Sequence, residues 1–353
     1  MDIAVIGASG DVGRAVAARL VGAGLLDRHE RLQLVGRRGG ESERVLEGFT
    51  VDLLDAFAEQ APMIDVALDP EDIAADLIIM AAGLTIPQRP SPGFRRDILA
   101  RENAEVFRTY ARALAKNGSG HELVVVVSNP VELGVATFAR ELGRKRVFGM
   151  AAYLDSLRFR KEIARELRMS RRAVHGFMAG EHGDHLVPLW STVHIFGLSG
   201  EDRLRVIQRL RRGARTADFV RAFSAVKTLL AEMVGRGEVK EAFRYLDTLS
   251  PDLRVAAKPF VAHFSGAKTV TATAEAAVEF VATIHHGHDA VVSGQILLEG
   301  EYGIRGPVGV PFVLSFRGIE EVVELALEDE ELEALKEAAQ ATTQLVEEEG
   351  HDR

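Results

Sequence analysis

The sequence predicts an α/β protein in which a doubly wound parallel sheet is followed by an α+β domain with antiparallel strands and an inserted helical segment. Three observations lead to this prediction. Short apolar runs alternate with longer amphipathic segments over the first 150 residues, a glycine-rich turn follows the first run, and the pattern changes after Met150.

The early apolar runs have the length and composition of buried strands. They are Ile3–Ile6, Leu32–Val35, Leu77–Met80 and Leu123–Val127. Runs with little polar alternation are typical of parallel strands that helices cover on both faces. We therefore assign residues 1–150 to a doubly wound domain of the Rossmann type.

A second domain is expected over residues 151–353. Its expected elements are, in chain order, a helix with Leu154, Leu157, Ile163 and Leu167 on one side, a strand near 173–179, a polar turn at Glu181–Asp184, two antiparallel strands at Ala290–Leu298 and Val308–Phe316, and a final helix from about Ile319.

A helical insertion is expected within this domain, at about residues 216–264. Its apolar residues recur at helical spacing: Phe219, Phe223, Val226, Leu230, Val239, Phe243 and Leu246. Ser250 followed by Pro251 resembles a cap with proline at the first helical position. We expect two or three additional helices here that serve packing or subunit contact.

Composition excludes several classes of function. With 353 residues, of which 47% are hydrophobic, the chain can bury a full core, and a net charge of -9 without a basic stripe argues against nucleic-acid binding. The absence of cysteine excludes disulfides and thiolate chemistry. Met1 leads directly into the first strand without an export signal, and no apolar run would span a membrane, so we expect a cytoplasmic protein.

The glycine-rich turn is the first candidate binding site. Gly7, Gly10 and Gly13, with Asp11 and Val12 between the last two glycines, join the first strand to a helix. Glycines at a first strand-to-helix junction permit a tight turn and close backbone approach, and the helix N-terminus offers N–H groups to a pyrophosphate. The turn therefore predicts a dinucleotide cofactor.

The end of the second strand indicates which dinucleotide is bound. NAD sites usually place an acid there for the ribose hydroxyls, but this chain has Gly36, Arg37 and Arg38. A missing carboxylate removes repulsion of a 2'-phosphate, and arginine can bind that phosphate through paired bonds, with Ser42 adding a hydroxyl. We predict NADP, with NAD possible; the alternative is that both arginines are ordinary surface charges.

Several further motifs resemble the lactate/malate dehydrogenase family, in family order over most of the chain. They are the Gly7 turn, Ala82-Gly83, Val127-Ser128-Asn129-Pro130-Val131, Leu154-Asp155-Ser156-Leu157-Arg158, Gly180-Glu181-His182-Gly183-Asp184 and Gly309-Val310-Pro311. With Gly36-Arg37 in place of the acid, the chain looks closest to archaeal-type NADP-linked malate dehydrogenases. The resemblance implies a homodimer or homotetramer. It also implies five further cofactor-binding residues, which are Ala82, Gly83, Asn103, Val127 and Asn129.

The chemistry of such an enzyme accounts for four of these residues. Oxidising a secondary alcohol removes a hydride and a proton, so a base with a pKa near the working pH is needed, and His182 is the candidate. The resemblance makes Asp155 the carboxylate beside that imidazole. Arg158, three residues later on the same helix, fits the substrate carboxylate, and Asn129 would hydrogen-bond the reacting oxygen.

The segment from Leu84 to Asp97 resembles the family's mobile substrate loop, although it is longer and richer in proline. Arg96 matches the arginine that polarises the carbonyl when the loop closes, with Arg95 as the alternative. The second carboxylate of malate would meet Arg89, whereas Gln88 in that place would favour lactate or a larger 2-hydroxy acid.

The predicted function is thus a NADP-dependent malate dehydrogenase acting on a small dicarboxylate. The alternatives are another 2-hydroxyacid dehydrogenase, a metal-dependent NAD glycosidase on the same architecture, and a non-catalytic protein that retains the fold. His285, His286 and His288 could suggest a metal, but no acidic or cysteine partner can be placed beside them, so we predict no metal site.

Overall fold

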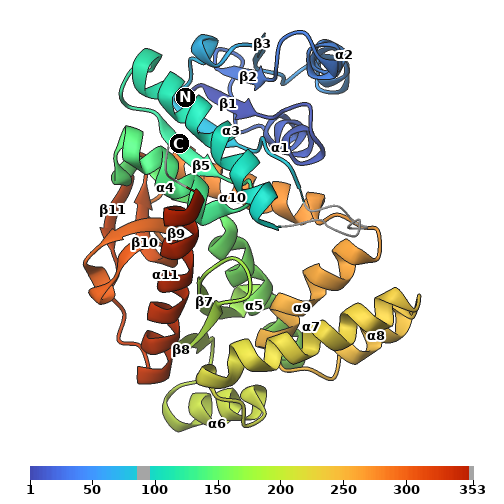
Figure 1. The fold of residues 1–353 in the computed structure, drawn as a ribbon, viewed down its shortest axis with the longest axis vertical. Helices are drawn as coiled ribbons and strands as arrows, with labels where there is room; N and C mark the ends of the chain where they lie inside the picture. Colours follow the sequence, from blue (N-terminus) through green and yellow to red (C-terminus); the bar gives the residue numbers. More distant parts are fainter. Residues whose placement is uncertain (86–95, 350–353) are drawn as a thin grey trace.

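The computed structural model describes residues 1–85 and 96–349, and of residues 96–99 it describes the backbone only. One sheet runs through the molecule in the order β3-β2-β1-β4-β5-β6-β9-β10-β7-β8, and β11 pairs with β10 (Figure 1).

The first half of this sheet is parallel. Its strands are β1 (Ile3–Ile6), β2 (Arg31–Val35), β3 (Met63–Ala67), β4 (Leu77–Met80), β5 (Leu123–Val126) and β6 (Val147–Gly149). The strand order reverses at β1, which pairs in parallel with β2 on one side and with β4 on the other. This is the doubly wound arrangement that the sequence predicts, and in such sheets ligands bind at the carboxyl ends of the two strands where the order reverses.

Helices cover both faces of the parallel strands. They are α1 (Asp11–Gly22), α2 (Glu41–Ala56), η1 (Pro70–Asp72), α3 (Arg96–Asn117), α4 (Val131–Leu142) and η2 (Arg144–Arg146). Alternate residues of β1 enter different apolar clusters, Ile3 and Val5 in one and Ala4 and Ile6 in the other. Burial on both faces explains why these runs lack polar alternation.

The second half of the sheet is antiparallel. It is built from β7 (Val174–Gly180), β8 (Leu186–Ile195), β9 (Ala290–Glu299), β10 (Arg305–Ser315) and β11 (Gly318–Val322). The helices around it are α5 (Ala151–Leu167), η3 (Arg171–Ala173), α6 (Gly200–Arg211), α10 (Val270–His285), η5 (Glu301–Gly303) and α11 (Asp329–Glu349). A parallel sheet followed by a second part with antiparallel strands confirms the predicted fold class.

The prediction of a final helix from about Ile319 is wrong in its start. Ile319 lies in β11, where it pairs with Leu314 of β10, and the helix begins only at Asp329. Glu320 and Glu321, which the prediction places in that helix, belong to β11 instead. Pairing to an available strand outweighs a weak local preference for helix.

The segment of residues 216–264 contains η4 (Thr216–Asp218), α7 (Phe219–Gly235), α8 (Val239–Leu246) and α9 (Pro251–Phe264), drawn in the lower part of Figure 1. Pro251 is the first helical residue of α9, as expected, but the Ser250 side chain makes no capping bond. The apolar faces of α7 and α9 pack with α5, β7 and β8 in a third core cluster. None of the described helices has the length and apolar character needed to cross a bilayer.

Candidate active site

His182 lies in the turn that joins β7 to β8, and its imidazole contacts a carboxylate of α5. Its Nδ1 atom is 2.7 Å from Oδ2 of Asp155, a residue 27 positions earlier that is only 3% exposed. A carboxylate that accepts the Nδ1 proton fixes the imidazole tautomer. Nε2, on the opposite side of the ring, is thereby left for proton exchange.

The environment of this pair favours its charged form. Burial by itself would lower the pKa of His182, but the charge of Asp155 and the bond to it outweigh burial and raise that pKa. Burial would likewise raise the pKa of Asp155, whereas His182 and Arg158 lower it below its usual value. A histidine that holds a proton this readily is suited to act as an acid and, once deprotonated, as a base.

Arg158 lies one helical turn beyond Asp155 and shares its carboxylate. One guanidinium nitrogen lies 2.9 Å from Oδ1 of Asp155, so each carboxylate oxygen serves one cation. A guanidinium has five N–H donors in a planar fork, and this contact uses one side of it. The structure thus brings His182, Asp155 and Arg158 together, with donors left for a substrate carboxylate.

Two further side chains reach the histidine turn, and neither was among the sequence candidates. Glu132, near the start of α4, is 2% exposed, and its Oε1 accepts a bond from the His182 backbone N–H at 2.8 Å. Burial raises the pKa of Glu132. Lys227 of α7 contacts both carboxylate oxygens of Asp184, at 2.5 and 2.7 Å. The sequence offered one signal for a buried role of Glu132, namely an acidic residue among the apolar residues at the start of α4.

Asn129 follows β5, and its backbone is held by a buried amide. Nδ2 of Asn103, on α3, donates to the Asn129 carbonyl at 2.6 Å and to the Leu84 carbonyl at 2.9 Å, while Oδ1 accepts from the Leu84 N–H at 2.7 Å. A Cβ on Gly83 would lie 2.9 Å from the Asn103 Oδ1 atom. Asn103 therefore ties the start of the substrate segment to the Asn129 corner through backbone bonds.

The Gly7 turn has the shape that a dinucleotide phosphate needs. Gly7 has φ +83°, and a Cβ there would lie 2.6 Å from the Ala82 Cα; a Cβ on Gly13 would lie 2.2 Å from the Gly7 carbonyl oxygen. The first bond of α1 back to its cap runs from Arg14 N to Gly10 O. The N–H groups of residues 11–13 precede the helical ladder and can receive an anion.

The carboxyl end of β2 is crowded at Gly36. A Cβ on this residue would lie 2.4 Å from the Ser42 Oγ atom, so an acidic side chain does not fit without rearrangement. Ser42 Oγ also accepts from Arg37 N at 3.3 Å and donates to Ser9 Oγ at 2.9 Å, which connects this corner to the glycine turn.

The two arginines at this corner differ in their partners. Arg38 is engaged by Asp69, with Nε 2.9 Å from the carboxylate. Among the side chains of residues 1–85 and 100–349, no carboxylate pairs with the Arg37 guanidinium. The two guanidinium groups therefore differ in their charge environment.

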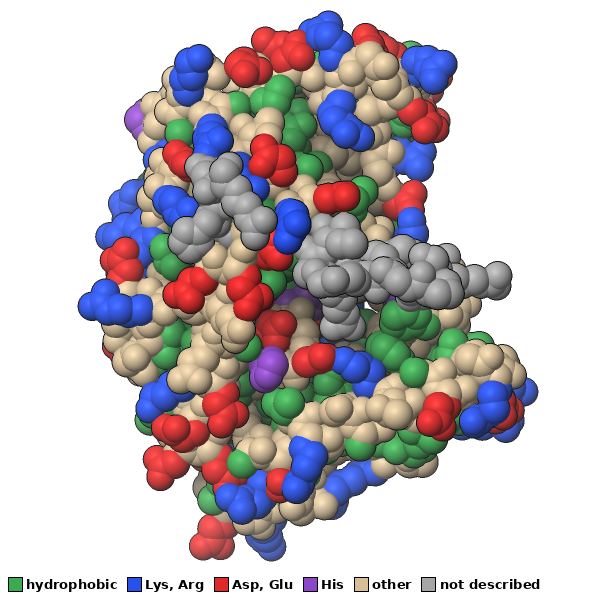
Figure 2. Space-filling model, in the orientation of Figure 1, with side chains coloured by type: hydrophobic (Ala, Val, Ile, Leu, Met, Phe, Trp, Pro, Cys, Tyr) green, Lys and Arg blue, Asp and Glu red, His purple; other side chains and the backbone are tan. Residues whose placement is uncertain are grey.

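Part of the predicted site lies outside the described residues. Gln88, Arg89 and Arg95 fall in the segment 86–95, and Arg96 is described only as the first backbone position of α3. Val127 follows β5, where its N–H donates to Met80 at the end of β4. On the face drawn in Figure 2, acidic, basic and histidine side chains gather near the middle of the molecule.

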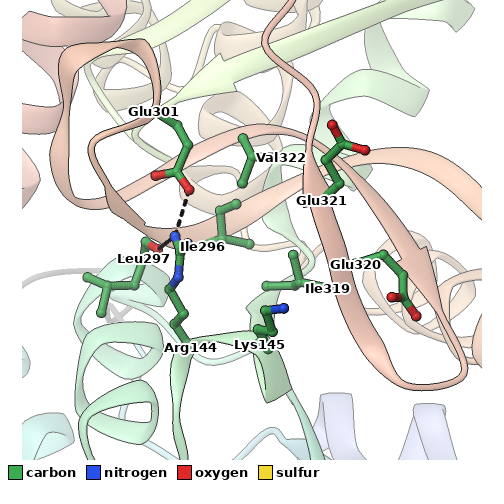
Figure 3. A pocket seen from close by; sticks show the side chains of 9 residues that line it. All are labelled: Arg144, Lys145, Ile296, Leu297, Glu301, Ile319, Glu320, Glu321 and Val322. Carbon is green, nitrogen blue, oxygen red and sulfur yellow. Dashed lines mark hydrogen bonds and ion pairs between the residues drawn. The ribbon is translucent and has the colours of Figure 1, made fainter.

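A separate cavity of about 300 Å³ lies at β9, β11 and η2, and none of His182, Asp155 and Arg158 lines it (Figure 3). Arg144 contacts Glu301 there at 2.8 Å, an ion pair that ties η2 to η5. Across the described part of the chain, no group of three or more histidine or acidic side chains is placed to hold a metal ion, the cluster of His285, His286 and His288 included.

Comparison with known proteins places the whole chain in one family. The model for the lactate/malate dehydrogenase NAD-binding domain matches residues 1–149, and the model for the α/β C-terminal domain of the same family matches residues 213–351. A malate dehydrogenase of Chlorobium phaeobacteroides is 29% identical, covering 96% of this chain and 95% of that protein. A malate dehydrogenase of Geotalea daltonii is 32% identical and covers 86% and 87%.

Solved structures agree on the fold. The lactate dehydrogenase of Cryptosporidium parvum, solved with lactic acid and nicotinamide adenine dinucleotide, superposes with a TM-score of 0.76 at 24% identity and covers 100% of this chain and 98% of that one. The malate dehydrogenase of Aeropyrum pernix gives 0.71 at 24% identity, with 98% and 97% covered. The chain belongs to the lactate/malate dehydrogenase family and is an NAD(P)-dependent dehydrogenase.

Proposed function

We propose that this dehydrogenase interconverts malate and oxaloacetate and prefers NADP(H) to NAD(H). The observation that carries the reaction is the buried Asp155 carboxylate, which orients a proton carrier with one oxygen and a substrate-binding cation with the other. Family membership decides against the glycosidase and the non-catalytic alternatives. Relatives named malate dehydrogenase, aligned over most of the chain, support the choice of malate.

Each residue of the cluster has a defined task. The nicotinamide ring, when bound, supplies the hydride acceptor or donor. His182 takes the hydroxyl proton of the substrate at Nε2, and Asp155 remains ionised and stabilises the imidazolium. Arg158 binds the C1 carboxylate through two parallel bonds, which fixes the orientation of the reacting carbon. Asn129 bonds the reacting oxygen.

The NADP preference rests on the corner at the end of β2. Gly36 stands where an acid would bind ribose hydroxyls and repel a phosphate, and an acid here would require the Ser42 and Leu46 side chains to move. Arg37 is exposed and has no carboxylate partner among residues 1–85 and 100–349, so its guanidinium can receive a 2'-phosphate. The Ser42 hydroxyl accepts a bond from the Arg37 backbone N–H and donates to the Ser9 hydroxyl, so both hydroxyls lie at this corner.

The far end of the substrate is assigned from the sequence. We assign the second carboxylate of malate to Arg89, with Gln88 as the alternative, and carbonyl polarisation to Arg96. An unpaired buried carboxylate would cost several kcal/mol, and about 1.4 kcal/mol corresponds to a tenfold change in selectivity. An arginine at this place is therefore sufficient to separate malate from lactate.

The test is a comparison of kcat/KM for oxaloacetate and pyruvate, each with NADPH and NADH. We expect oxaloacetate with NADPH to give the highest value, and a chelator to leave it unchanged. A higher kcat/KM with pyruvate would make lactate, not malate, the substrate. A higher kcat/KM with NADH would contradict the NADP preference inferred from Gly36 and Arg37.

We also propose a homodimer or homotetramer, to be checked by light scattering after gel filtration.

A further inference from the structure

A lysine from the second half of the chain lies at the cofactor turn. Lys268, in the connection between α9 and α10, has its Nζ atom 2.5 Å from Oδ2 of Asp11, the first residue of α1. The contact holds the pKa of the Asp11 carboxyl below its usual value through the bond to Lys268 and the charge of that lysine. The two residues are 257 positions apart in the sequence.

A second ion pair, nearer the other end of α1, joins this helix to α10 itself. Arg19 of α1 contacts Glu275 of α10 at 2.6 Å, and the side chains are each 47% exposed. The Asp11–Lys268 pair has nearly the same exposure, 46% and 48%. Exposed pairs of this kind contribute little to stability. Packing of α1 against α10 brings Lys268 to this position, and the ion pair with Asp11 adds little stability of its own.

Asp11 creates an electrostatic problem for a phosphate-binding turn. An acid in the first turn of a helix stabilises the helix, because it faces the positive end of the helix dipole. The same carboxylate repels a pyrophosphate that approaches the N–H groups of residues 11–13. A cation beside the turn would remove this repulsion, and Lys268 is the cation that contacts Asp11 from outside α1.

We propose that Lys268 is a cofactor-binding residue whose ammonium group donates to the diphosphate of the dinucleotide while it remains paired with Asp11. An ammonium has three donors, and the contact with Asp11 uses one of them. The half-exposed side chain keeps the others open to a ligand. The proposal rests on the use of a dinucleotide at the Gly7 turn, and it places part of the affinity for the cofactor outside the family's NAD-binding domain, residues 1–149.

The test is a binding titration of the whole protein, with the fluorescence of NADPH and NADH as the signal and without substrate. We expect K268M to weaken both cofactors by about tenfold or more, as loss of a charge-assisted bond predicts, and K268R to restore most of the affinity. R19M, which breaks the other ion pair between α1 and α10, is the matched control and should bind as the wild type does.

Nucleotide fragments separate the diphosphate from the rest of the cofactor. By calorimetry, ADP should bind K268M about tenfold more weakly than the wild type, whereas adenosine should bind both equally. Equal affinity of K268M and wild type for ADP would overturn the proposal. So would a D11N K268M double variant with wild-type affinity, because Lys268 would then only neutralise Asp11.

The outcomes also separate this proposal from the proposed NADP preference. Loss of Lys268 should weaken NADPH and NADH equally, so the ratio of their dissociation constants stays that of the wild type. A wild-type protein that prefers NADH would contradict the NADP assignment but would not bear on the proposed role of Lys268. A K268M variant that binds both cofactors normally would overturn the role of Lys268 alone.

Discussion

The buried carboxylate of Glu132 accepts a hydrogen bond from the backbone N–H of His182 at 2.8 Å, although the two residues are 50 positions apart. The bond fixes the backbone of the turn at the residue that moves the proton. We expect E132A to lower the free energy of unfolding by about 1–3 kcal/mol, because a buried N–H loses its partner. Chemical denaturation measures this change.

E132Q is the matched control, since an amide oxygen can accept the same bond. We expect E132Q to keep most of the stability that E132A loses. An E132A variant as stable as E132Q would show that the hydrogen bond accepted from the His182 N–H does not contribute to stability.

Loss of the Asp155 charge should change the pH dependence of the reaction. In D155N, burial acts on His182 without the compensating carboxylate, so the pKa of His182 falls. At neutral pH less imidazolium is available, and we expect kcat for reduction of oxaloacetate to fall by about 100-fold or more, because the tautomer is also no longer fixed. The pH profile of kcat/KM should show the titration of His182 at lower pH.

The same pair gives stability a defined pH window. The raised pKa of His182 adds stability that is complete below its unfolded value, 6.5, and is lost as pH rises through the folded value. The lowered pKa of Asp155 adds stability above 3.8 that is lost as pH falls through the folded value. The Tm difference between wild type and D155N should be largest between these two values. A pH-independent difference would contradict this coupling.

Replacement of Arg158 should act on the substrate and leave cofactor binding unchanged. R158Q removes the planar cation that pairs with the C1 carboxylate, and we expect kcat/KM for oxaloacetate to fall by about 100-fold or more. The dissociation constant of NADPH should stay within about twofold. Steady-state kinetics and fluorescence titration measure the two effects.

Arg165 offers a control on the same helix. It is half-exposed and pairs with Asp247 at 2.7 Å, well away from the carboxylate shared by His182 and Arg158. R165Q should leave both constants unchanged. A similar loss in R165Q would mean that the effect arises from α5 as a whole.

The two arginines after β2 should differ in their effect on cofactor choice. R37Q should weaken NADPH by about tenfold or more and leave NADH unchanged, because only NADPH carries the 2'-phosphate. We expect a smaller change from R38Q, since part of the Arg38 guanidinium is already bonded to Asp69. The ratio of the dissociation constants of NADPH and NADH checks both expectations, and equal effects of the two variants would contradict the assignment to Arg37.

The local pattern of apolar residues predicted a strand correctly where the residues of that segment alone determine its structure. Ile3–Ile6 and Leu77–Met80 are strands over the residues that the sequence predicts, because central parallel strands must be apolar on both faces. β3 escaped prediction, since as an edge strand it is largely exposed or half-buried and has no uninterrupted apolar run. The prediction of a helix at Ile319 failed because this segment pairs with β10, and such pairing depends on a partner elsewhere in the chain.

The sequence by itself determined the family motifs, the glycine turn and the identities of His182, Asp155 and Arg158, because these depend on residue type and local spacing. Tertiary structure decided which partners reach them. Glu132, Lys227 and Lys268 come from helices or connections that packing brings beside residues distant in the chain. Such contacts depend on how α4, α7 and α10 pack, and no local pattern encodes that packing.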